Sequence, residues 1–218
     1  GANLFPARTT YIKVLNEENP QNSDDERFLS DLYYADIYDG DNNFVSWDSN
    51  ENNLFAEINQ ALENDTIDLY PDVKLGRLAC TNEEEVTTVV NKIISYENSK
   101  AWTKNWFNNI ILIGGDTVPG PLGDDTNVDE GELVNQAVFN VMDGFIPTKL
   151  WGSNGKLGSL NPTGVDRINS KTNNGCGFID WSGHGAPWVW TTFPHNGRRQ
   201  VLPSPYGSYT NGDIEDLE

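Results

Sequence analysis

The apolar run at residues 109–113 is the feature that most constrains the fold of this chain. It lacks polar alternation and is closed by Gly114 and Gly115. Uninterrupted runs of this length are typical of strands buried on both faces of a parallel sheet. Residues 177–181 form another short run of the same kind. The sequence therefore predicts an α/β fold with a largely parallel sheet flanked by helices.

Helices are predicted between these strands. Thr81 and Glu84 form a capping-box pattern, and valines and isoleucines then recur at helical spacing, so this helix is expected to bury one face. Another helix is expected near residues 130–142. Further strands are predicted at residues 9–15, 32–38 and 73–78, a solvated loop at residues 16–26 and a turn at residues 39–43. We find no repeat, and no linker that would divide the chain.

The chain is strongly acidic, with 33 Asp and Glu against 14 Lys and Arg and a net charge of −19. This charge excludes nucleic acid as a partner, because phosphate binding needs Lys and Arg. It fits a merely soluble acidic protein and, equally, a secreted, salt-tolerant or calcium-loaded surface. No apolar run approaches the ~18 residues of a membrane span, and no signal peptide is recognisable. We therefore expect a mature, processed extracellular protein.

Acidic and amide side chains in three loops offer oxygen ligands for calcium. The loops are residues 36–43, 48–53 and 123–129, and the candidate ligands are Asp39, Asp41, Asp124 and Asp125. Plain solvated loops explain the same residues equally well. A structural calcium ion is therefore one of two interpretations, and no cofactor is expected for catalysis.

Three of the predicted strands end in loops that carry reactive or acidic side chains. Cys80, Asp116 and His184 each follow one of these strands. Parallel strands bring their carboxyl ends to the same edge of a sheet, where chemistry in α/β proteins gathers. We therefore expect all three loops to share one edge.

His184 is the strongest candidate for a catalytic side chain. It is one of two histidines in the chain and lies between Gly183 and Gly185. Flanking glycines allow a sharp turn and leave the imidazole open to a substrate, and an imidazole titrates near neutral pH. The alternative is a histidine that merely decorates a turn. His195, in contrast, has the setting of an ordinary exposed loop residue.

The nucleophile is harder to place. Cys176 precedes the strand that ends near His184, and that strand separates the two residues by more than about 15 Å. Cys80 lies before a helix N-terminus, which favours the thiolate, but it also fits a small apolar residue closing a strand. Ser182 lies too close to His184 along the strand end, and two isolated histidines make no zinc site. The cysteines leave a disulfide, two buried thiols or one reactive thiol open.

Several segments together resemble the gingipain family of cysteine peptidases. Residues 33–38 read YYADIY, residues 70–78 read YPDVKLGRL, and a predicted helix ends in ISYE at residues 94–97. Residues 179–185, IDWSGHG, resemble the segment that carries the catalytic histidine in that family. The resemblance extends from about Asn3 to Glu218. It implies a caspase-like fold, a cysteine–histidine pair and endopeptidase activity on protein or peptide substrates.

The resemblance also implies roles for individual residues. His184 would be the general base that activates the thiol and then protonates the leaving amine. The backbone N–H of Gly185 would lie near the oxyanion. Asp116 falls where the family keeps an acidic residue beside the histidine.

Substrate binding is expected near a second group of residues. Asp129, Glu130 and Glu132 fall where arginine-specific members keep the carboxylate for the residue before the cut, so cleavage after Arg, and less well after Lys, is expected. An acidic helix N-terminus, favoured by the helix dipole, explains these carboxylates equally well. Trp188 is expected to line the substrate cleft.

The chain is expected to be incomplete. In the family the nucleophile lies on the strand after the histidine loop, and this sequence ends at Glu218 before that strand; a strand before Gly1 is also expected. Residues 1–218 would then be the histidine-bearing part of a processed precursor that acts with its other chains. The rival interpretation is a non-catalytic, calcium-loaded module whose tryptophans around His184 bind peptide or glycan.

Overall fold

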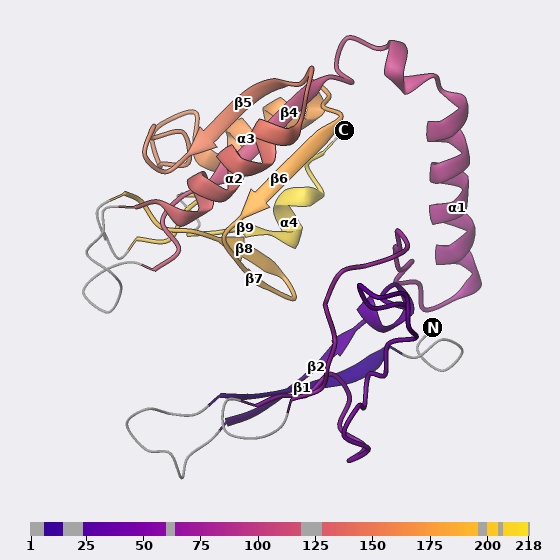
Figure 1. Ribbon diagram of the computed structural model, residues 1–218. Helices are drawn as coiled ribbons and strands as arrows, with labels where there is room; N and C mark the ends of the chain where they lie inside the picture. The colour runs from indigo at the N-terminus through magenta and orange to yellow at the C-terminus, as the bar shows by residue number, and fades with distance from the viewer. Residues whose placement is uncertain are drawn as a thin grey trace. The chain divides into compact units, whose positions relative to one another are not determined.

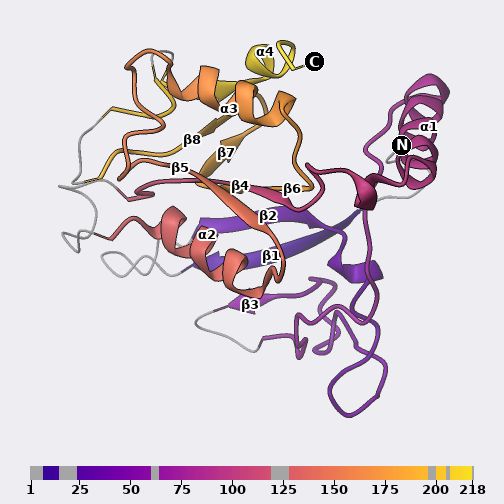
Figure 2. The same ribbon diagram turned by 90° about the horizontal axis from the view of Figure 1, so that it is seen from above.

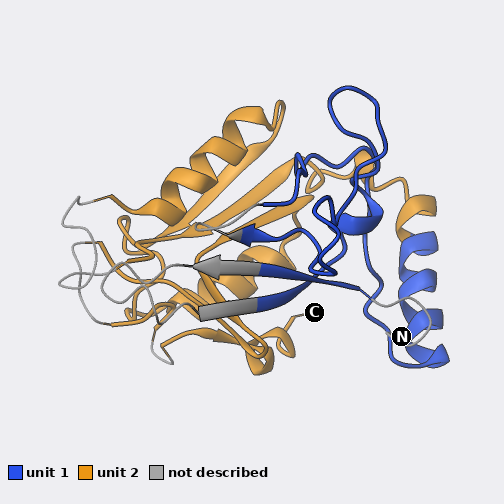
Figure 3. Cartoon of the chain, turned by 60° about the horizontal axis from the view of Figure 1, so that its bottom comes forward, with its two compact units in different colours: residues 1–95 blue, residues 96–218 orange. Residues whose placement is uncertain are grey.

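A computed structural model describes residues 7–14, 24–59, 64–118, 128–195, 200–204 and 207–217. The chain divides into two compact units, Gly1–Ser95 and Tyr96–Glu218 (Figure 3). The boundary falls inside helix α1 (Glu83–Asn98) rather than in a linker. No described helix is both long enough and apolar enough to cross a membrane.

Unit 1 contains a three-stranded sheet in the order β2-β1-β3. β1 (Arg8–Val14) pairs antiparallel with β2 (Asp24–Ser30) and parallel with the short β3 (Ile58–Asn59). The strand predicted at residues 9–15 is confirmed over its described part. The loop predicted at residues 16–26 is wrong at its end, because residues 24–26 pair with residues 12–14 of β1.

Residues 32–38 do not form the predicted strand. Leu32–Tyr34 is a 3-10 helix, and the backbone N–H groups of Ala35 and Asp36 both donate to the Leu32 carbonyl. The N–H groups of Ile37 and Tyr38 donate to the carboxylate of Asp72 instead of to a neighbouring strand. The predicted turn at residues 39–43 is confirmed by two backbone hydrogen bonds within it, from the Asp39 N–H to the Asn43 carbonyl and from the Asn42 N–H to the Asp39 carbonyl.

The strand predicted at residues 73–78 is also absent. The N–H groups of Asp72 and Val73 both converge on the carbonyl of Ala35, and no strand pairs with the segment in the described structure. Val73, Leu75 and Leu78 are exposed. The spacing of apolar residues alone therefore does not predict the secondary structure of this segment, because its backbone hydrogen-bond partners lie elsewhere in the chain.

Helix α1 is confirmed, but its surroundings are not as predicted. Its cap is shifted by one residue, because Asn82 accepts the N–H of Glu85 and the Glu85 carboxylate accepts the N–H of Thr81. The helix contains no buried residue, and Val90 and Ile94 are 37% and 48% exposed. The expectation that this helix buries an apolar face is wrong.

Unit 2 is built on the predicted parallel sheet. β4 (Asn109–Gly114) lies between β5 (Ile146–Trp151) and β6 (Phe178–Ser182), and both neighbours run parallel to it (Figure 1). The central position of β4 explains why its side chains are almost completely buried from Ile110 onwards.

Helices cover both faces of this sheet (Figure 2). α2 (Glu130–Val141), predicted at residues 130–142, packs against β4 and β6. α3 (Gly164–Asn173) lies on the opposite face, where its Val165 and Ile168 pack in one core cluster with Ile111 and Ile113. The α/β prediction is thus confirmed for this unit.

A second, smaller sheet follows β6 directly. It consists of β7 (His184–Ala186), β8 (Val189–Thr191) and β9 (Tyr209–Thr210), all antiparallel, and the short helix α4 (Asn211–Ile214) follows β9. Trp181 of β6 packs edge-on against Trp190 of β8, with ring centroids 5.1 Å apart. This contact joins the hairpin that begins at His184 to the core of unit 2.

The start of α2 approaches the sheet so closely that only glycine fits there. A Cβ atom on Gly131 would lie 2.5 Å from the carbonyl oxygen of Ser182. We expect Gly131→Ala to lower the free energy of unfolding by about 2 kcal/mol and the Tm by about 4–8 °C. Gly212→Ala is the matched control, because its Cβ would meet nothing closer than 3.6 Å. Equal melting temperatures for the two variants would contradict the close packing.

Candidate active site

Asp116 and His184 lie at the same edge of the parallel sheet. β4 and β6 are hydrogen-bonded neighbours, with Gly114 opposite Ser182, and each candidate follows its strand by two residues. The predicted shared edge is therefore confirmed for these two loops. The argument fails for Cys80, because residues 73–78 form no strand and Cys80 belongs to unit 1.

The two glycines beside His184 serve different purposes. A Cβ on Gly183 would lie 2.6 Å from the Thr191 carbonyl, so the backbone needs glycine there to approach β8. A Cβ on Gly185 would meet nothing within 4 Å, which leaves the space beside the imidazole open. His184 itself is exposed, with its ring 6.0 Å from that of Phe193. The imidazole is thus presented to solvent at the strand end.

The His184 ring is oriented by a backbone carbonyl. Its Nε2 lies 2.5 Å from the carbonyl oxygen of Thr117. A carbonyl only accepts hydrogen bonds, so Nε2 carries the hydrogen in this arrangement. In the neutral ring the other nitrogen, Nδ1, is then the proton acceptor. The geometry selects one tautomer and assigns Nδ1 as the basic atom.

Asp116 acts on the other end of the same peptide group. Its Oδ1 accepts the N–H of Val118 at 2.8 Å, and this N–H and the Thr117 carbonyl belong to one peptide bond. A hydrogen bond to one end of a peptide polarises the group and strengthens the bond at the other end. Asp116 is buried, and its backbone pairs with that of Phe193. The carboxylate and the imidazole are therefore linked through a fixed peptide.

Glu130 is engaged by the same loop. Both the N–H and the Oγ1 hydroxyl of Thr117 donate to Glu130 Oε2 at 3.0 Å. Burial raises the pKa of the Glu130 carboxyl, but hydrogen bonds from Thr117 and from its own backbone outweigh that effect, so the pKa lies below its usual range. The carboxylate is consequently ionised and faces Thr117.

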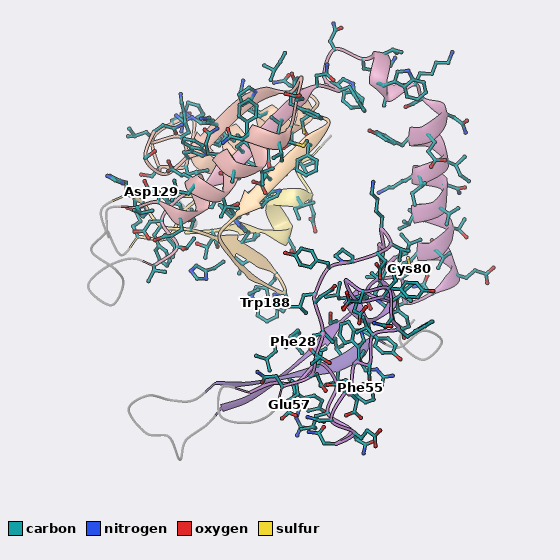
Figure 4. The ribbon with its side chains drawn as sticks, in the orientation of Figure 1. Phe28, Phe55, Glu57, Cys80, Asp129 and Trp188 are labelled. Atoms are coloured by element: carbon teal, nitrogen blue, oxygen red, sulfur yellow. The ribbon has the colours of Figure 1, made fainter. Side chains whose placement is uncertain are left out.

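Asp129 and His195 form a pair that the sequence analysis missed. His195 Nδ1 lies 2.8 Å from Oδ2 of Asp129, which Figure 4 labels, and the Asp129 side chain is only 9% exposed. The other oxygen, Oδ1, is buried and has no hydrogen-bond partner in the described structure. The expectation that His195 is an ordinary loop residue is wrong. No sequence signal joins two residues that lie 66 positions apart.

Glu132 points to a different loop. Its carboxylate accepts the N–H of Ser153 at 2.8 Å and the Ser153 hydroxyl at 2.6 Å. Burial raises the pKa of the Glu132 carboxyl, although the bonds from Ser153 act in the opposite direction. The three acidic residues at the start of α2 are thus separated by their partners, and Asp129 alone retains a buried oxygen without one among the described residues.

The tryptophans near His184 do not form a common platform. Trp181 and Trp190 pack against each other, and Trp181 also packs against Tyr209 at 5.0 Å, so these rings belong largely to the interior of the hairpin. Trp188, at the turn between β7 and β8, is 66% exposed (Figure 4). Trp188 is therefore the most exposed ring of the three, whereas Trp181 and Trp190 line a cavity of about 390 Å³ with Tyr209.

Only Cys176, of the two cysteines, lies in the same unit as His184. Both are free thiols, Cys80 buried in unit 1 and Cys176 half-buried in unit 2. Cys176 precedes β6, whereas His184 follows it, and burial raises the pKa of the Cys176 thiol. A higher pKa makes a thiol less reactive, so Cys176 has the properties of a structural residue.

The calcium candidates are distributed over separate loops. Asp39 accepts the N–H groups of Asn43 and Asp41, which lowers its pKa and closes the turn at residues 39–43. Asp124 and Asp125 lie outside the described residues. Within the described part of the chain, no group of three or more His, Cys, Asp or Glu side chains gathers as a metal site.

Comparison with known proteins identifies a family. The family model of peptidase family C25 matches residues 3–217, almost the whole chain. No curated protein and no solved structure matches the chain significantly.

Proposed function

Because the chain belongs to peptidase family C25, the gingipain family of cysteine peptidases, we propose that His184 is the general base of an endopeptidase. The family acts on protein substrates, and the parallel sheet with helices is compatible with a caspase-like fold. The observation that carries the proposal is the bond from His184 Nε2 to the Thr117 carbonyl, because it leaves Nδ1 as the nitrogen that can accept a proton.

The proposed reaction uses His184 twice. Nδ1 takes the proton of a cysteine thiol, and the thiolate attacks the scissile carbonyl carbon. The N–H of Gly185 donates to the oxyanion that forms. The imidazolium then protonates the leaving amine as the C–N bond breaks, and water hydrolyses the thioester to release acid and thiol. Throughout, the Thr117 carbonyl holds the hydrogen on Nε2 and so keeps the ring in one orientation.

We propose that the thiol comes from a segment outside residues 1–218. The position of Cys176 before the start of β6, opposite the end that carries His184, supports this, as does β6 itself, which pairs only with β4 among the described strands. A further strand beside β6 would bring its own carboxyl end to the edge that carries His184. The full-length protein should cleave peptides, and a thiol-alkylating reagent should abolish the cleavage. Turnover that survives alkylation would contradict a cysteine mechanism.

We further propose cleavage after basic residues, Arg before Lys, with Asp129 as the carboxylate that binds them. Glu130 and Glu132 are occupied by Thr117 and Ser153, whereas Asp129 keeps a buried oxygen without a partner in the described structure. A guanidinium group provides the planar donors that a buried carboxylate binds best. Trp188 is exposed at the turn between β7 and β8 and is proposed to line the substrate cleft.

A structural calcium ion is proposed for one of the three acidic loops. Asn50 and Asn52 both place their side-chain amides on the buried carboxylate of Glu57, and Asp48 caps the same loop (Figure 4 labels Glu57). Carboxylate and amide oxygens at alternate positions are typical calcium ligands, and rotated amides would present oxygen instead of nitrogen. Such an ion would suit the secreted protein that the charge of −19 favours.

Calcium is therefore expected to raise the Tm relative to a chelator by about 5 °C or more, since a ligand bound only to the folded state stabilises it. The measurement is thermal unfolding with added calcium and with chelator. Glu57→Gln should lose the shift, whereas Glu97→Gln, an exposed carboxylate on α1, should keep it. An unchanged Tm in the native protein would contradict the ion.

A further inference from the structure

We propose that Glu130 is a positioning residue for His184, acting through Thr117, and that it does not bind substrate. This rests on the proposed role of His184 as the base. Glu130 makes no contact with the imidazole among the described interactions, and its carboxylate is directed at the loop that carries the accepting carbonyl.

Thr117 is held at three points. Its N–H and its hydroxyl donate to one oxygen of Glu130, and its carbonyl accepts from His184. Two bonds from one residue to the same oxygen fix both the backbone and the side chain of that residue. The direction of the Thr117 carbonyl, and hence of the His184 ring, therefore depends on where the Glu130 carboxylate lies.

The Glu130 carboxylate is itself on a rigid support. Glu130 is the first residue of α2, and the next residue, Gly131, donates its N–H to the carbonyl of Gly115 at 3.0 Å. Because Gly131 also packs against the Ser182 carbonyl, the helix start is fixed to both β4 and β6. A positioning group is most effective when it belongs to such a packed element.

Two carboxylates bracket the carbonyl that holds the imidazole. Glu130 accepts the backbone N–H of Thr117, and Asp116 accepts the backbone N–H of the next residue, Val118. The bond to Asp116 polarises the peptide group that contains the Thr117 carbonyl and strengthens that carbonyl as an acceptor, whereas the bonds from Thr117 to Glu130 fix its direction. The arrangement favours the hydrogen on Nε2 of His184 and so leaves Nδ1 as the base.

The inference is tested by measuring the tautomer of His184 directly. The sample is full-length protein with ¹⁵N-labelled histidine and its reactive thiol blocked, and the His184 signals are identified by their loss in His184→Ala. The native protein should show one neutral tautomer with hydrogen on Nε2. Glu130→Ala should show a mixture of the two tautomers. An unchanged tautomer in Glu130→Ala would overturn the inference.

Kinetics separate positioning from substrate binding. Glu130→Ala should lower kcat about tenfold and leave the KM for arginyl peptides unchanged, because ring orientation matters in the transition state. Glu130→Gln keeps an acceptor oxygen, so its kcat should fall less than that of Glu130→Ala. Asp143→Asn, an exposed charge beyond the other end of α2, is the control. A raised KM with unchanged kcat in Glu130→Ala would make Glu130 a substrate ligand and overturn the inference.

A second variant covers the case in which Glu130→Ala does not fold. Thr117→Val removes only the hydroxyl bond, and it should shift the tautomer and kcat in the same direction by a smaller amount. No shift in either quantity would overturn the inference. Failure of the proposed function is distinguishable, since His184→Ala would then remain active whatever the tautomer.

Discussion

Replacing His184 with alanine is expected to lower kcat by about two to four orders of magnitude, the range for loss of a general acid–base group. The same imidazole takes the thiol proton and protonates the leaving amine, so both halves of the acylation step lose their proton carrier. The measurement is turnover of an arginyl peptide by the full-length protein, compared with the native enzyme.

Folding should survive this substitution. His184 is exposed and its ring makes a single hydrogen bond in the described structure, so its removal leaves no buried cavity. The Tm of His184→Ala should lie within a few degrees of the native value. Near-native turnover in a folded variant would contradict the assignment of His184 as the base.

The second large effect is expected at Asp129. Asp129→Asn keeps the shape of the side chain but removes the charge, and loss of one partner from a buried charge pair costs about 2–5 kcal/mol. The kcat/KM for arginyl peptides should therefore fall by about 10²- to 10³-fold, while peptides with an apolar residue before the cut should change little. The comparison of the two substrate series isolates the charge of the pocket.

The neighbouring carboxylates test this assignment. Glu132→Gln is the matched control, because it neutralises another carboxylate on the first turn of α2. The Glu132 carboxylate is hydrogen-bonded to Ser153. If Glu132→Gln, and not Asp129→Asn, loses the preference for arginine, the pocket has been assigned to the wrong carboxylate. If Asp129→Asn cleaves arginyl peptides as efficiently as the native protein, Asp129 does not determine the proposed specificity.

Elements with a local signal were predictable. β4 and β6 follow from apolar runs, and α2 lies where a helix was expected, near residues 130–142. Residues 32–38 and 73–78 have apolar runs that equally favour strands, but their backbone conformation depends on hydrogen-bond partners distant in the chain. Asp72 accepts the N–H groups of Ile37 and Tyr38, and the Ala35 carbonyl accepts from Asp72 and Val73. Such pairings leave no periodic pattern.

The site shows the same division. Topology was enough to place Asp116 and His184 at one edge, because neighbouring parallel strands share that edge. The group that orients the imidazole is a backbone carbonyl, and any residue type at position 117 would supply one. The Asp129–His195 pair depends on a loop that returns to α2 from 66 positions away. The backbone contacts and the long-range contacts of the site could therefore be identified only from the structure.

The most direct test of the account is covalent labelling by a peptidyl chloromethyl ketone that ends in arginine. The full-length protein should be labelled on one cysteine outside residues 1–218, identified by intact mass and peptide mapping. His184→Ala should be labelled about two orders of magnitude more slowly, because its thiol lacks a base. Absence of labelling, or a label on Cys80 or Cys176, would contradict the proposal that His184 activates a cysteine from another segment.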